Sequence, residues 1–527
     1  MTRPGPAECP VQARVDPELQ MNGSGPGRAR RLFSGWSANL FQMILGITQQ
    51  IALIPVFLHF WSSDVLAAWL AIYSAGNLVL MADAGLQLRA INRFLAFRSS
   101  ADGDGRTARF YAAMLRVYSG LAAILVAILI GAALFFPPST VLGFRSIAHF
   151  DAAFLVMTAG MVLTLPANLV SGLYRARGLY GRAVKLQSWG MLIAQILQLG
   201  VIVSTGSMVA VAIAYAASQL AVAGWFVLID APRLFPFLRG VRVRPSWSWT
   251  IGQFRRAASF GVSAATELAL VNLPVLLVSA FVPDRVAVAQ WGLTRVVAGL
   301  LRMLCTQATL PLAAELGHDH AVGLKEQLRS LYARGSVFVT LLASLVVSGL
   351  LPFWPDFFAL WTRGTIPYDP LLTITLLIGT ATAAPSILAL GYANYSNRGG
   401  LLVRTKGIQM VVFLLLSLVL IPSIGPLGAA LAIVSSDLLI QSGLLAVTVI
   451  RETLRHPWRH IACLMVTIIT VIVAGWTLGT AIRLGVPGTG SVRFVAECSA
   501  WLVGVVVMAS PLANRLFRAR LIAAIPR

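Results

Sequence analysis

The stretch QWGLTRVVAGLLRMLC, residues 290–305, decides how this chain folds, because it is largely apolar and yet carries two permanent cations. Arg295 and Arg302 stand seven residues apart, which puts them two turns apart on one face of a helix. A central arginine costs about 2.5–3.5 kcal/mol on membrane-insertion scales, so two of them are not expected to face lipid. The stretch therefore predicts a membrane-spanning helix whose arginines face the bundle interior or a water-filled cavity.

The composition extends this prediction to the whole chain. Hydrophobic residues make up 57% of the 527 and charged residues only 11%, against about 25% in a typical soluble domain, and the mean hydropathy is +0.80. Apolar runs of about 20 residues can each cross roughly 30 Å of hydrocarbon as a helix. We therefore predict an all-α polytopic membrane protein with about 14 transmembrane helices. The expected spans are 36–60, 65–88, 111–136, 150–174, 184–204, 207–230, 257–282, 286–312, 331–352, 369–392, 404–421, 426–450, 460–482 and 492–511.

Lysine and arginine are distributed unevenly between the two sides of these spans. With the N-terminus in the cytoplasm, 34 of the 41 basic residues lie on the cytoplasmic side and five lie in outer loops. Because short basic loops stay in the cytoplasm, the asymmetry predicts that both termini are cytoplasmic. Contact with anionic lipid headgroups then accounts for the net charge of +22, and no nucleic-acid partner is needed.

An internal repeat divides the first twelve spans into two sets of six. RRLFSGW at 30–36 precedes an apolar helix, a turn with Asp64 and a second helix, and RRAASFG at 255–261 precedes the same succession with Asp284 in the turn. Both copies begin on the cytoplasmic side, so the repeats are parallel and related by an axis near the membrane normal. A substrate is expected between the two resulting lobes.

These patterns predict a division of the chain into six parts. They are a disordered basic cytoplasmic tail at 1–35, an N-terminal lobe at 36–230, a cytoplasmic linker at 231–256, a C-terminal lobe at 257–450, two extra helices at 451–511 and a cytoplasmic tail at 512–527.

The loops are too short for most enzymes. The longest outer connection is 353–369 and the longest inner one is 231–256, and neither can fold as a catalytic domain. They carry no Ser/His/Asp set and no converging carboxylates. The four cysteines have no short pair spacing, and nothing else in the chain indicates a cofactor or a metal site. A transporter is therefore favoured over an enzyme.

Two motifs resemble a known family. WSSDVLAAWLAIYSAGNLVLMADAGLQ at 61–87 resembles the second-helix region of polysaccharide exporters and O-antigen flippases in the multidrug/oligosaccharidyl-lipid/polysaccharide (MOP) superfamily. IPSIGPLGAALAIVSSDLLI at 421–440 resembles the entry to that family's twelfth helix. The resemblance implies two six-helix lobes that form a V around a central cavity and work by alternating access. It also implies a substrate of undecaprenyl-diphosphate-linked sugars.

Arg295 and Arg302 are the leading candidates for substrate contact. Arg295 lies about nine residues into its span, roughly 13–14 Å deep at 1.5 Å per residue, and its planar fork matches phosphate oxygens bidentately. Glu267 lies at a similar depth on the preceding span, so a structural ion pair with either arginine is the alternative.

Further polar residues within the spans are weaker candidates. Amides could hydrogen-bond sugar hydroxyls or could join helices to one another, and carboxylates could couple transport to an ion. With Glu267, the substrate candidates are Asn39, Gln42, Gln49, Asn77 and Asn272, and the coupling candidates are Asp83 and Asp437.

The motifs and the arginines together predict a flippase and not an enzyme. It would move an undecaprenyl-diphosphate-linked oligosaccharide, such as an O-antigen, lipopolysaccharide or exopolysaccharide unit, across the bacterial inner membrane. Its partners would be the lipid-linked oligosaccharide, membrane lipids and, as candidates, a polysaccharide polymerase or glycosyltransferases. The alternatives are a cation-coupled multidrug exporter of the same fold and, less favoured, a membrane polysaccharide polymerase or ligase.

The predicted orientation can be tested by cysteine labelling. In a background without other cysteines, a cysteine at Ser139 should react with an impermeant maleimide in intact cells, because 139 lies in an outer loop. A cysteine at Ser330 should react only after permeabilisation. Reversed labelling would overturn the orientation.

Overall fold

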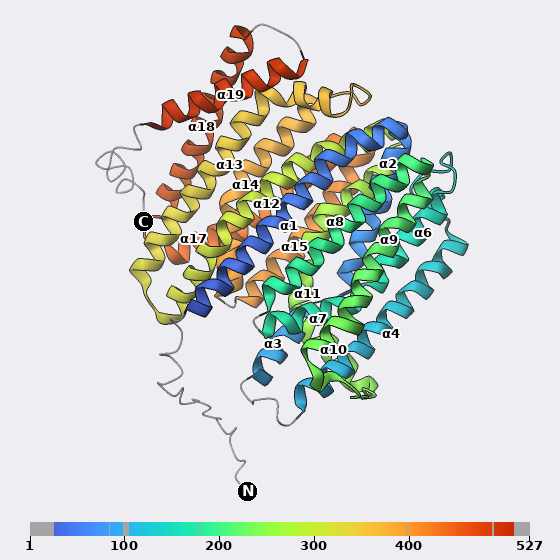
Figure 1. Ribbon diagram of the computed structural model, residues 1–527. Coiled ribbons are helices and arrows are strands. Elements are labelled where there is room, and N and C mark those ends of the chain that lie inside the picture. The colour runs from blue at the N-terminus through green and yellow to red at the C-terminus, as the bar shows by residue number, and fades with distance from the viewer. Residues whose placement is uncertain are drawn as a thin grey trace.

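The computed structural model describes residues 26–83, 85–98, 105–177, 179–396, 398–486 and 490–510. Within these ranges the chain is helical and contains no β-strand. The long helices lie side by side in one bundle, α18 lies along α13 at its edge, and α19 crosses these two helices near one end of the bundle (Figure 1). The tails predicted at 1–35 and 512–527 fall largely or wholly outside the described residues.

Fourteen helical segments of the described chain are long and apolar enough to cross a membrane, and they coincide with the fourteen predicted spans. The prediction of an all-α polytopic membrane protein is confirmed. The helices that form these spans, in three cases together with shorter elements that follow them, are α1 (Pro26–Phe60), α2 (Ser63–Leu78), α4 (Arg106–Phe135), α6 (Phe150–Leu163) with α7 (Leu165–Ala176), α8 (Tyr180–Thr205), α9 (Met208–Trp225), α11 (Trp247–Phe281), α12 (Arg285–Val322), α13 (Lys325–Trp361), α14 (Pro370–Tyr395), α15 (Gly399–Ile424), α16 (Pro426–Ser436), α18 (Pro457–Gly485) and α19 (Gly490–Ala509).

Shorter elements extend or connect these helices. Two of them are π-helices, which widen the helical turn and occur frequently at functional sites. The shorter elements are the 3₁₀ turn η3 (Val79–Asp83), α3 (Leu86–Arg98), α5 (Pro138–Val141), the π-helix η4 (Phe226–Asp230), α10 (Ala231–Leu234), the 3₁₀ turn η5 (Pro236–Leu238), the π-helix η6 (Asp437–Ala446) and α17 (Val447–Thr453).

The second predicted span, 65–88, is not one continuous helix. α2 ends at Leu78, η3 follows, and α3 starts at Leu86. Asp83 helps to form this break, because its carboxylate accepts hydrogen bonds from the Tyr118 hydroxyl and from the Gln87 backbone N–H, 3.4 Å away. The ADAGLQ motif therefore makes a corner between α2 and α3.

Gly85 at this corner brings the first half of the chain against the second. Its φ is +75°, and an added Cβ would lie 2.5 Å from the backbone nitrogen of Gly261 and 2.7 Å from the carbonyl oxygen of Ala257, both in α11. Only glycine permits both this conformation and this approach. The corner thus fixes α3 against the N-terminal part of α11.

The two halves also pack along the length of α2. This helix contacts both α11 and α12, and the largest buried apolar cluster contains Trp69 of α2 and Trp291 of α12. α1 approaches the second half by another route, since the Trp361 indole donates to the Ile51 carbonyl at 2.7 Å. α2 is therefore the principal contact between the halves.

We expect Gly85→Ala to lower the thermal stability of the protein more than Gly105→Ala does. Both glycines have a positive φ, 75° and 65°, so each substitution carries about 1–2 kcal/mol of left-handed strain. Only Gly85 meets backbone atoms, whereas no described atom lies within 4 Å of a Cβ at Gly105. Thermal unfolding in detergent measures the difference, and equal midpoints would contradict the proposed close packing.

Candidate functional site

Arg302 of α12 is held by two carboxylates from neighbouring helices. Its Nη2 lies 2.9 Å from Glu267 Oε2 of α11, and its Nη1 lies 2.8 Å from Asp437 Oδ2 of the π-helix η6. Each terminal nitrogen of the guanidinium group thus forms an ion pair with a different helix. Of the two arginines that the sequence singled out, Arg302 is the one that pairs with Glu267.

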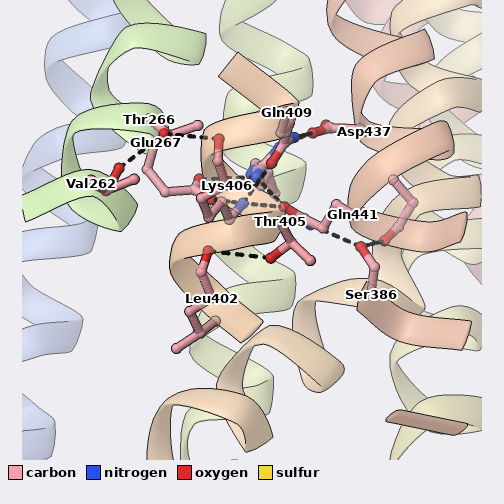
Figure 2. A network of polar contacts seen from close by, with 12 residues as sticks. Val262, Thr266, Glu267, Ser386, Leu402, Thr405, Lys406, Gln409, Asp437 and Gln441 are labelled. Carbon is pink, nitrogen blue, oxygen red and sulfur yellow. Dashed lines mark hydrogen bonds and ion pairs between the residues drawn. The ribbon is translucent and has the colours of Figure 1, made fainter. Parts of the chain in front are cut away.

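A second cation, Lys406 of α15, completes this arrangement. Its ammonium group contacts Glu267, donates to Gln409 Oε1 at 2.9 Å and donates to Gln441 Oε1 at 2.5 Å. Gln409 in turn donates to Asp437 Oδ1 at 2.5 Å. Figure 2 shows these side chains converging from α11, α15 and η6.

We call this group the charge cluster. It contains two cations, two carboxylates and two amides, so it is neutral overall. Lys406 is only 1% exposed, whereas the side chains of Glu267 and Arg302 are 32% and 24% exposed. The cluster is therefore buried at α15 and η6 and partly accessible at α11 and α12. Its members are Glu267, Arg302, Lys406, Gln409, Asp437 and Gln441.

Arg295 lies in a different environment from Arg302. One of its guanidinium nitrogens donates to the Val271 carbonyl of α11, and another lies 3.3 Å from the Ser74 hydroxyl of α2. Its Nε is buried without a hydrogen-bond partner. Among the described residues no carboxylate forms an ion pair with it. Arg295 therefore stands where α2, α11 and α12 meet and keeps its charge uncompensated.

The face of α12 between the two arginines is open. Gly299 lies on that face, is exposed, and would meet nothing within 4 Å if it carried a Cβ. Thr306, one turn beyond Arg302, is also exposed. On α11 the exposed Val271 lies beside Arg295. The arginines thus border accessible space.

The opposite face of α12 lines an apolar cavity of about 430 Å³. Val297, Leu300 and Leu304 of α12 form one wall, and α1, α13 and α19 supply the others, with Ile47 and Phe357 among their side chains. α12 therefore separates a polar region from an apolar one.

Among the other predicted site residues that the structure describes, Asp437 bonds to an arginine of the site, and Asn77, Asn272 and Asp83 make their hydrogen bonds elsewhere. The Asn77 and Asn272 side-chain amides donate hydrogen bonds to the carbonyls of Tyr73 and Leu268, each within its own helix. These hydrogen bonds do not join one helix to another. Asp83 belongs to the corner between α2 and α3, whereas Asp437 belongs to the charge cluster. The two candidates for ion coupling, Asp83 and Asp437, therefore lie in separate parts of the structure.

The amides predicted on α1 remain predictions. Gln42 and Gln49 are half-buried, and in the described part of the chain no hydrogen bond joins them to either arginine. The side chain of Asn39 lies outside those that the structure describes.

Lys406 is absent from the predicted site residues, yet it lies inside α15, is almost fully buried and belongs to the charge cluster. One signal in the sequence could have identified it. Lys406 falls inside the predicted span 404–421, and Gln409 follows it by three residues, on the same helix face.

Comparison with solved structures places this fold among transporters. The lipid II flippase MurJ, in an inward closed conformation, aligns with a TM-score of 0.66 at 11% identity and covers 91% of this chain and 99% of its own. An inward-facing multidrug resistance MATE family transporter of the MOP superfamily aligns at 0.59 and 13% identity over 80% of this chain and 95% of its own. The MATE transporter VcmN of Vibrio cholerae aligns at 0.53 and 15% identity, over 80% and 97%.

The protein is therefore a multi-pass membrane protein with the fold of MOP-superfamily transporters. The chain matches no protein-family model and no curated protein.

The charge cluster yields a prediction about stability. Arg302→Met should lower the amount of folded protein, because removing one member of a buried ion pair costs about 3–5 kcal/mol. Adding Asp437→Asn should restore much of it, since Lys406 would then neutralise Glu267 alone. Yield and thermal stability of the purified variants measure this.

Arg295→Met is the matched control for this experiment. It removes the same charge from the same helix but leaves the cluster intact, so Asp437→Asn should not rescue it. If Arg302→Met proved as stable as the wild type, the cluster would not have the structural role assigned to it.

Proposed function

We propose that the protein is a flippase for an anionic lipid-linked oligosaccharide, in keeping with the polysaccharide exporter and O-antigen flippase resemblance of its motifs. The substrate would be a glycan unit on undecaprenyl diphosphate, moved across the bacterial inner membrane. The proposal rests chiefly on one observation: Arg295 is a cation within a membrane span whose charge no described carboxylate neutralises.

The position of Arg295 suits a diphosphate. It lies at the junction of α2 with α11 and α12, which belong to opposite halves of the chain. A guanidinium held there by two neutral oxygens retains donors for a phosphate, which it can bind bidentately. The open space at Gly299 lets a ligand approach along the same helix face. We therefore assign diphosphate contact to Arg295.

Arg302 takes a lesser role in this proposal. Glu267 and Asp437 already hold both edges of its guanidinium, so a phosphate would have to displace a carboxylate to reach it. We propose that Arg302 and Glu267 lie at the rim of the substrate site. Their ion pair would maintain the shape of the site and stabilise the fold around it. Asn39, Gln42, Gln49, Asn77 and Asn272 stay candidates for contact with the sugars.

The apolar cavity on the other face of α12 supports a lipid-linked substrate. Its lining of aliphatic and aromatic side chains, among them Leu304, Trp354 and Phe357, suits a hydrocarbon chain. A diphosphate at Arg295 and a prenyl chain in this cavity would place the two parts of one amphipathic molecule on either side of α12.

A cation-coupled multidrug exporter is the alternative, and the charges weigh against it. Such a protein needs a carboxylate free to bind a cationic drug or a coupling ion. Glu267 is paired with Arg302 and Lys406, and Asp437 with Arg302. Asp83 accepts a hydrogen bond from Tyr118 at the corner between α2 and α3. Each of these carboxylates already has an internal partner.

The remaining parts of the proposal follow from the sequence. The N-terminal lobe, 36–230, and the C-terminal lobe, 257–450, would rock against each other to expose Arg295 to either side in turn. Both termini would be cytoplasmic, and a polysaccharide polymerase or glycosyltransferases would act on the same glycan.

Arg295→Ala should reduce flipping of a prenyl-diphosphate sugar in proteoliposomes by about tenfold or more, normalised to folded protein, because a charge-assisted bidentate contact is lost. Arg295→Lys should recover only part of the rate, since it keeps the charge without the planar fork. Gly299→Phe should also slow flipping, because it fills the open space without removing a charge.

Arg145→Ala is the control, because it removes an arginine from an outer loop between α5 and α6, far along the chain from the site. The proposal is wrong if Arg295→Ala flips the substrate at the rate of this control while both proteins are equally well folded.

A further inference from the structure

A second cavity lies well away from the charge cluster, at the end of the bundle where α3 and α4 meet the start of α11. Its volume is about 760 Å³. The walls come from the last turns of α3, the first turns of α4, the segment 243–246 and the first three turns of α11. Nearly all of these residues belong to the predicted cytoplasmic side, since they follow the predicted span 65–88 or precede the predicted spans 111–136 and 257–282. We call it the basic pocket.

Arginine dominates the lining of this pocket. The described residues that line it include no aspartate or glutamate, and two of the arginines stand on α11 or just before it. Among the residues that the structure describes, no carboxylate forms an ion pair with Arg93, Arg244 or Arg256, and three such guanidinium groups at one pocket favour a multiply charged anion. The five arginines are Arg93, Arg106, Arg109, Arg244 and Arg256.

Neighbouring groups show how close these cations lie. Burial, together with the charges of Arg93 and Arg256, lowers the pKa of Arg89, which stands one turn before Arg93 on α3. Two like charges therefore act on one guanidinium from α3 and α11. Binding an anion among them would relieve this repulsion.

Two helix N-termini also open at the pocket. Arg106 is the first residue of α4, whose N-cap Gly105 provides no side-chain hydrogen bond. Ser246 is the N-cap of α11 and lines the pocket with Ser248. The Ser246 hydroxyl accepts a hydrogen bond from the Trp249 backbone N–H at 3.3 Å, and the partial positive charge of the helix N-termini attracts phosphate groups. The backbone thus reinforces the charge of the arginines.

Aromatic side chains also line the pocket. Phe110 packs edge-on against Phe97 and Trp249, with ring centroids 5.8 and 6.0 Å apart. Trp247, two residues before Trp249, is 74% exposed, and Ile251 is also exposed. Exposed tryptophan beside arginine is typical of a protein surface at the headgroup level of a membrane.

We propose that the basic pocket binds a phosphate-bearing ligand, either the headgroup of an anionic phospholipid or a small soluble phosphate. The arginines and the two helix N-termini would hold the phosphate oxygens, and the Ser246 and Ser248 hydroxyls would contact the remainder of the headgroup. Because the pocket joins α3 and α4 to α11, its ligand would tie the N-terminal half of the chain to the start of the C-terminal half. This site is separate from Arg295 and does not depend on the transported substrate.

The test measures thermal unfolding of the purified full chain in detergent, with phosphatidylglycerol, phosphatidylcholine or inorganic pyrophosphate added. Phosphatidylglycerol, and not phosphatidylcholine, should raise the midpoint by several degrees, because a ligand that binds the folded state stabilises it. Equal stabilisation by pyrophosphate alone would identify a soluble phosphate as the ligand. Absence of stabilisation by both anions would overturn the proposal.

Two variants with matched controls locate the effect. The double variant Arg244→Gln, Arg256→Gln should bind the ligand more weakly, so that the half-saturating ligand concentration rises about tenfold or more. Arg242→Gln with Arg255→Gln removes the same charge from adjacent positions that do not line the pocket, and it should bind as the wild type does. Equal weakening in both double variants would mean diffuse attraction only, and the pocket would not be a site.

Gly252→Leu provides a test that leaves every charge in place. Gly252 lines the pocket, and a Cβ there would meet no atom within 4 Å, so leucine should be accommodated in the fold and fill the cavity. We expect the variant to unfold at the wild-type midpoint without ligand and to lose the stabilisation by phosphatidylglycerol. Gly224→Leu in α9, also at an open position, is its control. Undiminished stabilisation of Gly252→Leu would contradict the proposal.

Discussion

The free energy of placing a charge in hydrocarbon governs the arrangement of polar side chains in this protein. An unpaired ionised group at the centre of a bilayer costs several kcal/mol or more. Glu267, Arg302, Lys406 and Asp437 meet this constraint together, since their four charges cancel. Arg295 does not, because it has only a carbonyl and a hydroxyl for partners. Of the two arginines on this face of α12, Arg295 is therefore the one whose charge no described carboxylate neutralises.

The same constraint distinguishes polar contacts that resist helix movement from polar contacts that allow it. The charge cluster joins α11, α12, α15 and η6 through ion pairs, so relative movement of these elements would expose buried charges. The polar contact from Arg295 to α2 is a single hydrogen bond of 3.3 Å to Ser74. Movement of α2 against α12 thus breaks a weak bond and no ion pair. Such a division suits a transporter whose two halves move against each other.

The sequence predicted the number and positions of the spans well, because apolar length alone determines them. It also predicted that Arg295 and Arg302 avoid lipid. It named Glu267 as a partner for one of the two arginines, but it did not identify Asp437 as the second partner of Arg302. Glu267 and Asp437 are 170 residues apart, and the packing of α15 against both α11 and η6 brings them together. Lys406 was missed because it lies near the end of a span, where a lysine ordinarily reaches water.

Local backbone geometry was the least predictable feature. The break at η3 depends on Tyr118 in another helix, and the close approach of Gly85 to α11 depends on both halves being folded. The π-helix η6 places Asp437 and Gln441 toward the same cluster (Figure 2), and no periodicity in the sequence distinguishes it from an α-helix. These features arise from tertiary contacts and not from propensity.

The sign of the transported charge is the central claim, and it can be measured directly. The wild-type protein in proteoliposomes would be given three fluorescent substrates: a prenyl-diphosphate sugar, the same prenyl sugar without the diphosphate, and a lipophilic cationic dye. The account predicts rapid movement of the first, slow movement of the second and none of the third beyond protein-free vesicles. Movement of the dye with exclusion of the diphosphate would contradict it.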